Sequence, residues 1–152
     1  VGTKENGAKV YIDYAHTPDA LLNALKALRL HTIGNIILVF GAGGDRDHGK
    51  RSLMGSVAND NADHIFITDD NPRNEAPEKI RKEILDGCSN AVEISDRATA
   101  ILTALEKVDY GDVLLIAGKG HETGQIIGDD ILPFNDKEFV SMSLALLEGK
   151  KV

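Results

Sequence analysis

The chain has 152 residues, a length that suits one domain with a single buried core and is too short for two. Its formal net charge of −7 argues against nucleic acid as a partner, because an acidic surface repels a polyanion. Its apolar runs are far shorter than the ~20 residues that span a bilayer, no leader is recognisable, and Cys88 has no disulfide partner, so we expect a cytoplasmic protein without membrane contact and with an inert thiol.

Short apolar runs bounded by Gly, Asp or Asn alternate with helical patterns along the chain. Thr17 is a good N-cap with Pro18 at the first helical position, and leucines then recur at spacings of three and four. In chain order the predicted elements are strand 10–12, a helix from Pro18, strand 36–40, a helix from near Arg51, strand 65–68, helix 75–85, strand 91–94, helix 96–105, strand 113–117 and a last helix over about 136–147. The terminal segments 2–7 and 149–152 are expected to be irregular.

This alternation predicts an α/β fold, doubly wound, with a mostly parallel sheet and helices on both faces. The strand order cannot be read from the sequence. In such a sheet the loops that follow the strands converge on one edge, where ligands bind. The loops that carry Gly, Asp, Asn, Arg and His are DYAHTPDA (13–20), GAGGDRDHGKR (41–51), TDDNPRNE (68–75) and AGKGHETG (117–124). We therefore expect a ligand site at the carboxyl edge of the sheet.

Segment 43–52, GGDRDHGKRS, has the G-x-x-x-x-G-K spacing of a phosphate-binding P-loop. A working P-loop needs Ser or Thr after the lysine as a magnesium ligand, and here Arg51 stands there. Two of the residues between the glycines are acidic and would repel a triphosphate. We reject a P-loop and expect the glycines to allow a sharp turn that places Arg46 over the sheet edge, with a solvated turn as the alternative.

In TDDNPRN, Pro72 fixes its own φ and keeps Asn71 extended, so Asn71 and Arg73 are presented by a stiff segment. An amide beside a guanidinium suits a ligand that carries both an amine and a carboxylate. The alternative is a turn that caps the next helix and leaves Arg73 in solvent.

In GKGHE, Glu122 is interpreted as an anion for a substrate ammonium. A zinc-protease helix is excluded because Gln125 stands where the second histidine would be. His16, His48 and His121 lie on converging loops, but their spacing is not that of metal ligands, so we expect no metal site in this chain.

In this order and spacing, DYAHTPDAL, GGDRDHGKRSLMG, TDDNPR and AGKGHE resemble the C-terminal domain of the Mur ligases, over about residues 9–147. The resemblance implies a Rossmann-like domain of an ATP-dependent ligase in peptidoglycan precursor synthesis. In that family a substrate carboxylate is phosphorylated, and an incoming amino group attacks the acyl phosphate. It also implies an N-terminal domain for the UDP-sugar and a central domain with the phosphate loop and the Mg2+ ligands. We expect this chain to be the third domain of a monomeric enzyme, to dock on the central domain, to carry no catalytic residue and to be inactive alone.

Carried over by motif, the resemblance implies a diaminopimelate site and a weaker nucleotide contact. The first comprises Arg46, Asp70, Asn71, Pro72, Arg73, Gly118 and Glu122, and the second, for ATP, comprises Asp13 and His16.

Arg73 carries the substrate prediction. Within the family, the DNPR form goes with ligases that add meso-diaminopimelate to UDP-N-acetylmuramoyl-L-Ala-D-Glu. The distal carboxylate of that amino acid can pair bidentately with a guanidinium, whereas the side-chain ammonium of lysine would meet a like charge. The alternatives are a binding module without catalysis and a ligase of the folylpolyglutamate synthetase type, which shares the fold.

Overall fold

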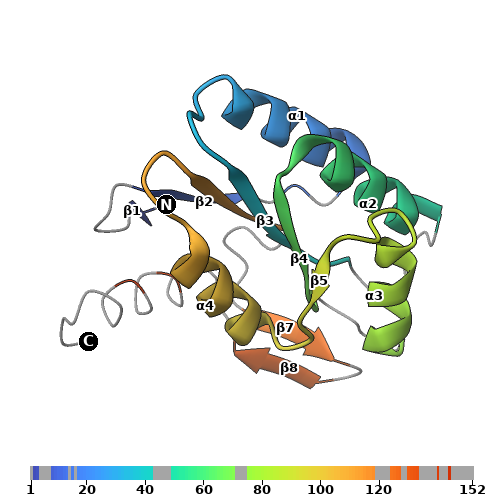
Figure 1. Ribbon diagram of the computed structural model, residues 1–152. Coiled ribbons are helices and arrows are strands. Elements are labelled where there is room, and N and C mark those ends of the chain that lie inside the picture. The colour runs from blue at the N-terminus through green and yellow to red at the C-terminus, as the bar shows by residue number, and fades with distance from the viewer. Residues whose placement is uncertain are drawn as a thin grey trace.

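The computed structural model describes residues 2–3, 8–13, 15, 17–42, 49–70, 75–118, 124–127, 130–133, 140 and 144. Within these residues, a six-stranded sheet has the order β1-β2-β6-β3-β4-β5 (Figure 1). Its strands are β1 (Gly2–Thr3), β2 (Lys9–Asp13), β3 (Ile36–Phe40), β4 (His64–Ile67), β5 (Val92–Glu93) and β6 (Val113–Ala117). Strands β2 to β6 pair in parallel, which confirms the predicted mostly parallel α/β sheet.

The edge strand β1 corrects the expectation of an irregular segment at residues 2–7. Gly2 and Thr3 pair antiparallel with β2, opposite Val10 and Lys9. This pairing uses backbone groups, so the polar composition of the segment gave no signal for it.

The helices are α1 (Pro18–Arg29), α2 (Gly49–Asn61), α3 (Pro77–Leu85) and α4 (Arg97–Lys107). Side-chain N-caps precede α1 and α4. The Thr17 hydroxyl accepts a hydrogen bond from the Ala20 N–H at 3.2 Å, as its prediction as N-cap requires. Asp96, predicted as the first residue of a helix, is instead the N-cap of α4, and α2 begins two residues before Arg51.

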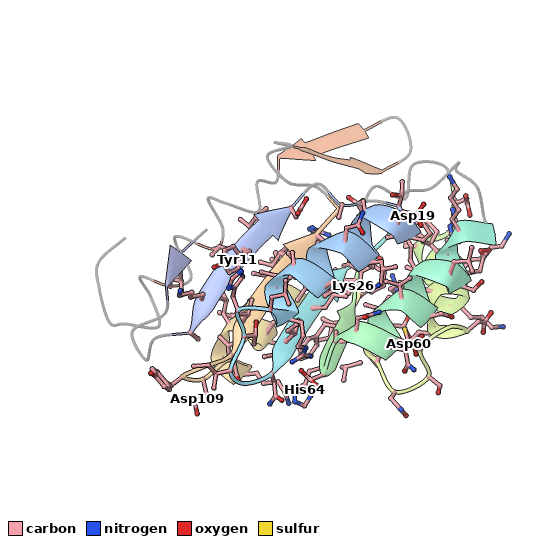
Figure 2. The ribbon with its side chains drawn as sticks, turned by 90° about the horizontal axis from the view of Figure 1, so that it is seen from above. Tyr11, Asp19, Lys26, Asp60, His64 and Asp109 are labelled. Carbon is pink, nitrogen blue, oxygen red and sulfur yellow. The ribbon has the colours of Figure 1, made fainter. Side chains whose placement is uncertain are left out.

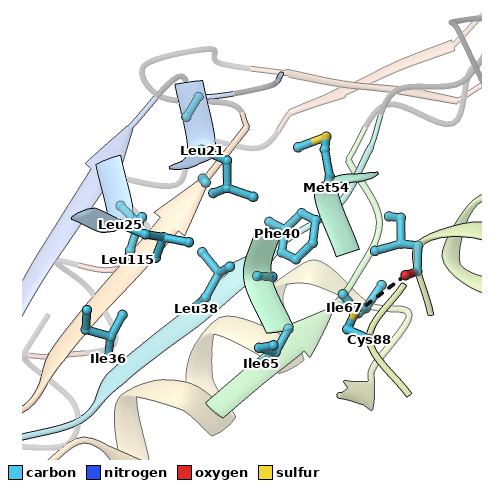
Figure 3. Close-up of a cluster of buried hydrophobic side chains, with 14 of the residues drawn as sticks. Leu21, Leu25, Ile36, Leu38, Phe40, Met54, Ile65, Ile67, Cys88 and Leu115 are labelled. Carbon is cyan, nitrogen blue, oxygen red and sulfur yellow. Dashed lines mark hydrogen bonds between the residues drawn. The ribbon is translucent and has the colours of Figure 1, made fainter. Parts of the chain in front are cut away.

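Helices cover both faces of the sheet, and the alternation of side chains along β3 shows how the core divides. Ile36, Leu38 and Phe40 pack on the face covered by α1, α2 and α3 (Figure 3), whereas Ile37 and Val39 pack on the face covered by α4. All five side chains are buried, as expected for a central parallel strand.

The C-terminal part of the chain contains one element that we did not predict and part of one that we did. A hairpin of β7 (Gly124–Ile127) and β8 (Asp130–Pro133) was not anticipated. Of the predicted last helix, the structure describes Val140 and Leu144, which are helical and packed in the α4-side core.

No helix among the described residues combines the length and apolar character needed to cross a membrane.

Cys88 is buried at 1% exposure, and its thiol donates to the Ile84 carbonyl at 3.5 Å (Figure 3). Burial raises the pKa of the Cys88 thiol to about 11. Burial and a raised pKa both agree with the predicted inert thiol, because the reactive form of a cysteine is the thiolate.

Candidate functional site at the carboxyl edge of the sheet

The predicted site residues that the structure describes lie at one edge of the sheet, where parallel strands end side by side. Asp13 ends β2 opposite Ala117, the last residue of β6, and Gly118 follows. Asp70 follows β4 by three residues. In Figure 2, Asp19 at the start of α1 lies toward this edge, and His64 and Asp109 lie toward the opposite one.

Gly118 brings three of the predicted residues together. Its N–H donates to the Asp13 carbonyl at 3.1 Å. Its backbone has φ 112°, a conformation that favours glycine. A Cβ at this position would lie 3.3 Å from Oδ2 of Asp70, so glycine also leaves room for that carboxylate. Loops after β2, β4 and β6 therefore converge on one point.

The two carboxylates at this point differ in exposure. Asp70 is buried, with 6% of its surface exposed. Asp13 is exposed, and its Oδ1 accepts the Ala15 N–H at 3.1 Å, which shapes the start of the loop toward α1. One carboxylate thus belongs to the packed base of the site, and the other to its rim.

The remaining predicted site residues lie outside the described residues. They are Arg46, Asn71, Pro72, Arg73 and Glu122 for the amino acid, and His16 for the nucleotide. The same holds for His48 and His121. Within the described ranges, no group of three His, Cys, Asp or Glu side chains is arranged to hold a metal ion.

Arg51 is one of the buried, paired arginines near the predicted site that sequence reasoning missed. It is 1% exposed, and its guanidinium forms two hydrogen bonds to Glu75 at 2.8 Å each and an ion pair with Glu83 at 3.1 Å. The residue that stands in place of the P-loop Ser or Thr is thus turned toward α3 and the chain before it.

Two more buried arginines support the segment that precedes residues 71–74. Arg81 pairs with the carboxylate of Asp69 and, through Nε, with Glu93 at 2.7 Å. Arg97 donates to the carbonyls of Asp69 and Ala117, each at 3.3 Å. Because Asp69 precedes Asp70 and Ala117 precedes Gly118, Arg97 joins the ends of β4 and β6.

A signal for these arginines was present in the sequence. Arg51 lies three and seven residues before Met54 and Ala58, which are buried on α2, and Arg97 lies three and seven before Ala100 and Ala104 on α4. A charged residue in register with an apolar stripe predicts burial, and a buried charge requires partners.

A hollow lies elsewhere on the molecule, between the C-terminal halves of α1 and α2. Lys26 and Asp60, both labelled in Figure 2, line it together with Leu30. Since these helices run antiparallel to the strands, their C-terminal halves lie toward the amino edge of the sheet. The hollow is therefore separate from the predicted site.

Comparison with known proteins identifies the family. Residues 1–120 match the family model described as "Mur ligase, glutamate ligase domain". The UDP-N-acetylmuramoyl-L-alanyl-D-glutamate--2,6-diaminopimelate ligase of Bradyrhizobium diazoefficiens is 58% identical over 142 residues, which cover 93% of this chain and 29% of that protein. A solved structure of a ligase with the same name is 42% identical, with a TM-score of 0.87 over 91% of this chain and 29% of its own.

The fold alone is shared more widely. The bifunctional folylpolyglutamate synthase/dihydrofolate synthase of Yersinia pestis is 20% identical, with a TM-score of 0.59 over 91% of this chain and 28% of that one. This chain thus spans less than a third of each of these three proteins. The match of the family model over residues 1–120 shows that the chain belongs to the Mur ligase family.

Proposed function

We propose that this chain is the C-terminal, amino-acid-binding domain of an ATP-dependent ligase that adds meso-diaminopimelate to UDP-N-acetylmuramoyl-L-Ala-D-Glu in the cytoplasm. The observation that carries the proposal is the contact of Gly118 with Asp13 and its close approach to Asp70. It places the starts of the DNPR and GKGHE loops next to each other at the edge where doubly wound folds bind ligands. The relative that is 58% identical carries the name of this activity.

In this proposal the domain acts by holding the nucleophile. Arg46 and Arg73 bind the carboxylates of diaminopimelate, and Glu122 and Asn71 bind one of its two amino groups. The domain then docks on the central domain, where the other amino group, in its neutral form, attacks the acyl phosphate. The amide bond forms as the bond between the acyl carbon and the phosphate oxygen breaks, and inorganic phosphate and a proton are released. The resemblance assigns Mg2+ to the central domain, where a divalent cation neutralises charge on phosphate oxygens. The contribution of this chain is positioning.

The two alternatives make different predictions. A binding module without catalysis would bind an amino acid or a phosphate but would not form an amide bond between two substrates. A folylpolyglutamate-type ligase has the same fold, so the fold does not separate it from a Mur ligase. The DNPR motif and the 42% identity to a solved diaminopimelate ligase favour the proposed substrate.

The proposal is tested in the full-length ligase with Arg73→Ala. The kcat/KM for meso-diaminopimelate and for L-lysine is measured in the wild type and in the variant. Loss of a desolvated pair between Arg73 and a carboxylate costs about 2–5 kcal/mol. The preference for diaminopimelate should therefore fall by tens to thousands of fold.

The matched control is Arg29→Ala. Arg29 pairs with Asp63 at 2.8 Å on an exposed part of the amino edge. This variant should keep the wild-type preference. An Arg73→Ala enzyme that still discriminates between the two amino acids as the wild type does would refute the assignment.

A further inference from the structure

Among the described residues, Arg51 pairs with two carboxylates in a largely buried ionic cluster, called here the Arg51 cluster: Arg51, Glu75 and Glu83. The side chain of Arg51 is 2% exposed, that of Glu75 14% and that of Glu83 23%. The two Arg51–Glu75 hydrogen bonds run in parallel, from Nη1 to Oε2 and from Nη2 to Oε1, at 2.8 Å each. Such a bidentate pair fixes the two groups in direction as well as in distance.

The residues of the Arg51 cluster lie next to two segments that carry predicted site residues. Arg51 lies in the first turn of α2, directly after the loop that carries Arg46. Glu75 directly follows residues 71–74, which carry Asn71 and Arg73. The cluster therefore joins a residue in the first turn of α2, after segment 43–48, to the residue that follows segment 71–74. These two residues, Arg51 and Glu75, are 24 positions apart in the sequence. The third member, Glu83, lies within α3 and ties both exits to that helix.

The start of the second loop is held by a separate pair. Asp69 is bound by Arg81 of α3, and the Asp69 carbonyl accepts from Arg97 of α4. The segment between Asp69 and Glu75 is thus anchored at both of its ends by buried guanidinium groups.

Stability alone is a weak reason for such a cluster. Burial of an ion pair costs desolvation that its Coulomb attraction only partly offsets, so apolar residues of similar size often serve stability as well. What the pair adds is a defined geometry. Lysine would keep the charge at position 51 but could not form the planar two-bond contact.

We propose that Arg51 is a positioning residue for the amino-acid site. By holding Glu75, it sets the spacing between the loop of Arg46 and the loop of Arg73, and so the selectivity for diaminopimelate. This inference rests on the proposed function.

The test is Arg51→Lys in the full-length ligase. Displacement of a binding group by about 1 Å can cost up to about 100-fold. The KM for diaminopimelate should therefore rise about 10- to 100-fold, and the preference over L-lysine should fall. The KM for ATP should stay at its wild-type value, because the residues predicted for the nucleotide, Asp13 and His16, lie on a different segment of the chain.

A second variant, Glu75→Gln, keeps the shape of the side chain and removes its charge. It should show the same rise in KM for diaminopimelate. The double variant should be no worse than the poorer single variant, since both changes break one interaction. Arg29→Lys is the matched control, because it weakens an exposed ion pair with Asp63 at the opposite edge, and it should change no KM.

Several outcomes would overturn the inference. One is a folded Arg51→Lys enzyme with the wild-type KM and preference. Another is an equal fall in kcat for all substrates with a lower Tm and unchanged KM values, which would mark a purely structural role. If Arg51→Lys does not fold, the same criteria apply to Glu75→Gln. A wild-type enzyme without preference for diaminopimelate would instead refute the proposed function.

Discussion

Gly118 combines an unusual backbone conformation with a close approach to another residue of the candidate site. Its φ of 112° is unfavourable for any residue with a Cβ, and Asp70 occupies the space that a Cβ would approach. A substitution at this position therefore changes the free energy of unfolding in two ways. It strains the backbone of residue 118, and it disturbs the packing of the buried carboxylate of Asp70.

Replacement of Gly118 by alanine should lower the free energy of unfolding of the 152-residue chain by about 1–3 kcal/mol. The measurement is urea unfolding monitored by circular dichroism. Gly111→Ala is the control, since Gly111 has φ 85° but its added Cβ would lie 3.6 Å from the nearest atom beyond its chain neighbours, the backbone nitrogen of Gly34. The Gly118 variant should lose more stability than the control. Equal losses would show that the contact with Asp70 adds nothing to the backbone strain.

Among the elements, α4 connects helix capping to the site. Asp96 caps the helix by accepting from the Thr99 N–H at 3.1 Å and from its hydroxyl at 2.6 Å. Arg97 is the next residue, and its guanidinium joins the ends of β4 and β6. The position at which α4 begins thus determines where this guanidinium lies.

Asp96→Ala should destabilise the chain by about 1 kcal/mol through loss of the N-cap. The comparison is with Asp96→Asn, whose side-chain oxygen can still accept from the Thr99 N–H and which should retain most of the stability. Thermal unfolding of the two variants and the wild type measures the difference. A Tm for Asp96→Ala that equals the wild-type value would contradict the assigned role of the cap.

At the scale of the whole molecule, a buried core separates a site at the carboxyl edge from the amino edge of the sheet. Apolar side chains on both faces of β3 and β6 make the sheet a rigid support. A domain of this kind suits movement as one body, and under the proposed function that movement would carry bound diaminopimelate to a reaction centre on another domain. The chemistry would then need both domains.

The 152-residue chain alone should therefore form no ATP-dependent ligation product. The assay uses radiolabelled diaminopimelate, ATP and UDP-N-acetylmuramoyl-L-Ala-D-Glu, with the full-length ligase as the positive control. Titration calorimetry of the chain with diaminopimelate tests binding separately. Product formed by the isolated chain would contradict the division of roles between the domains.

The sequence by itself determined the main strands and helices and the family, and the edge at which ligands bind stays a prediction. Strands 36–40 and 113–117 were predicted with the bounds that the structure has, and Thr17 was correctly identified as a cap. These features depend on neighbours within a few residues, through side-chain periodicity and capping, so they can be read locally. The motif residues were read in the same way, because their spacing lies within single loops.

Only the tertiary structure decided which distant segments meet. It placed β6 between β2 and β3, paired Gly2–Thr3 with β2 and buried Arg51 against Glu75, 24 residues away. The choice of which strands pair with each other leaves no pattern in their side chains. In the same way, several carboxylates along the chain could have paired with each arginine. The partner is chosen by packing of the helices on the sheet, because a buried guanidinium is stable only where carboxylates or carbonyls surround it.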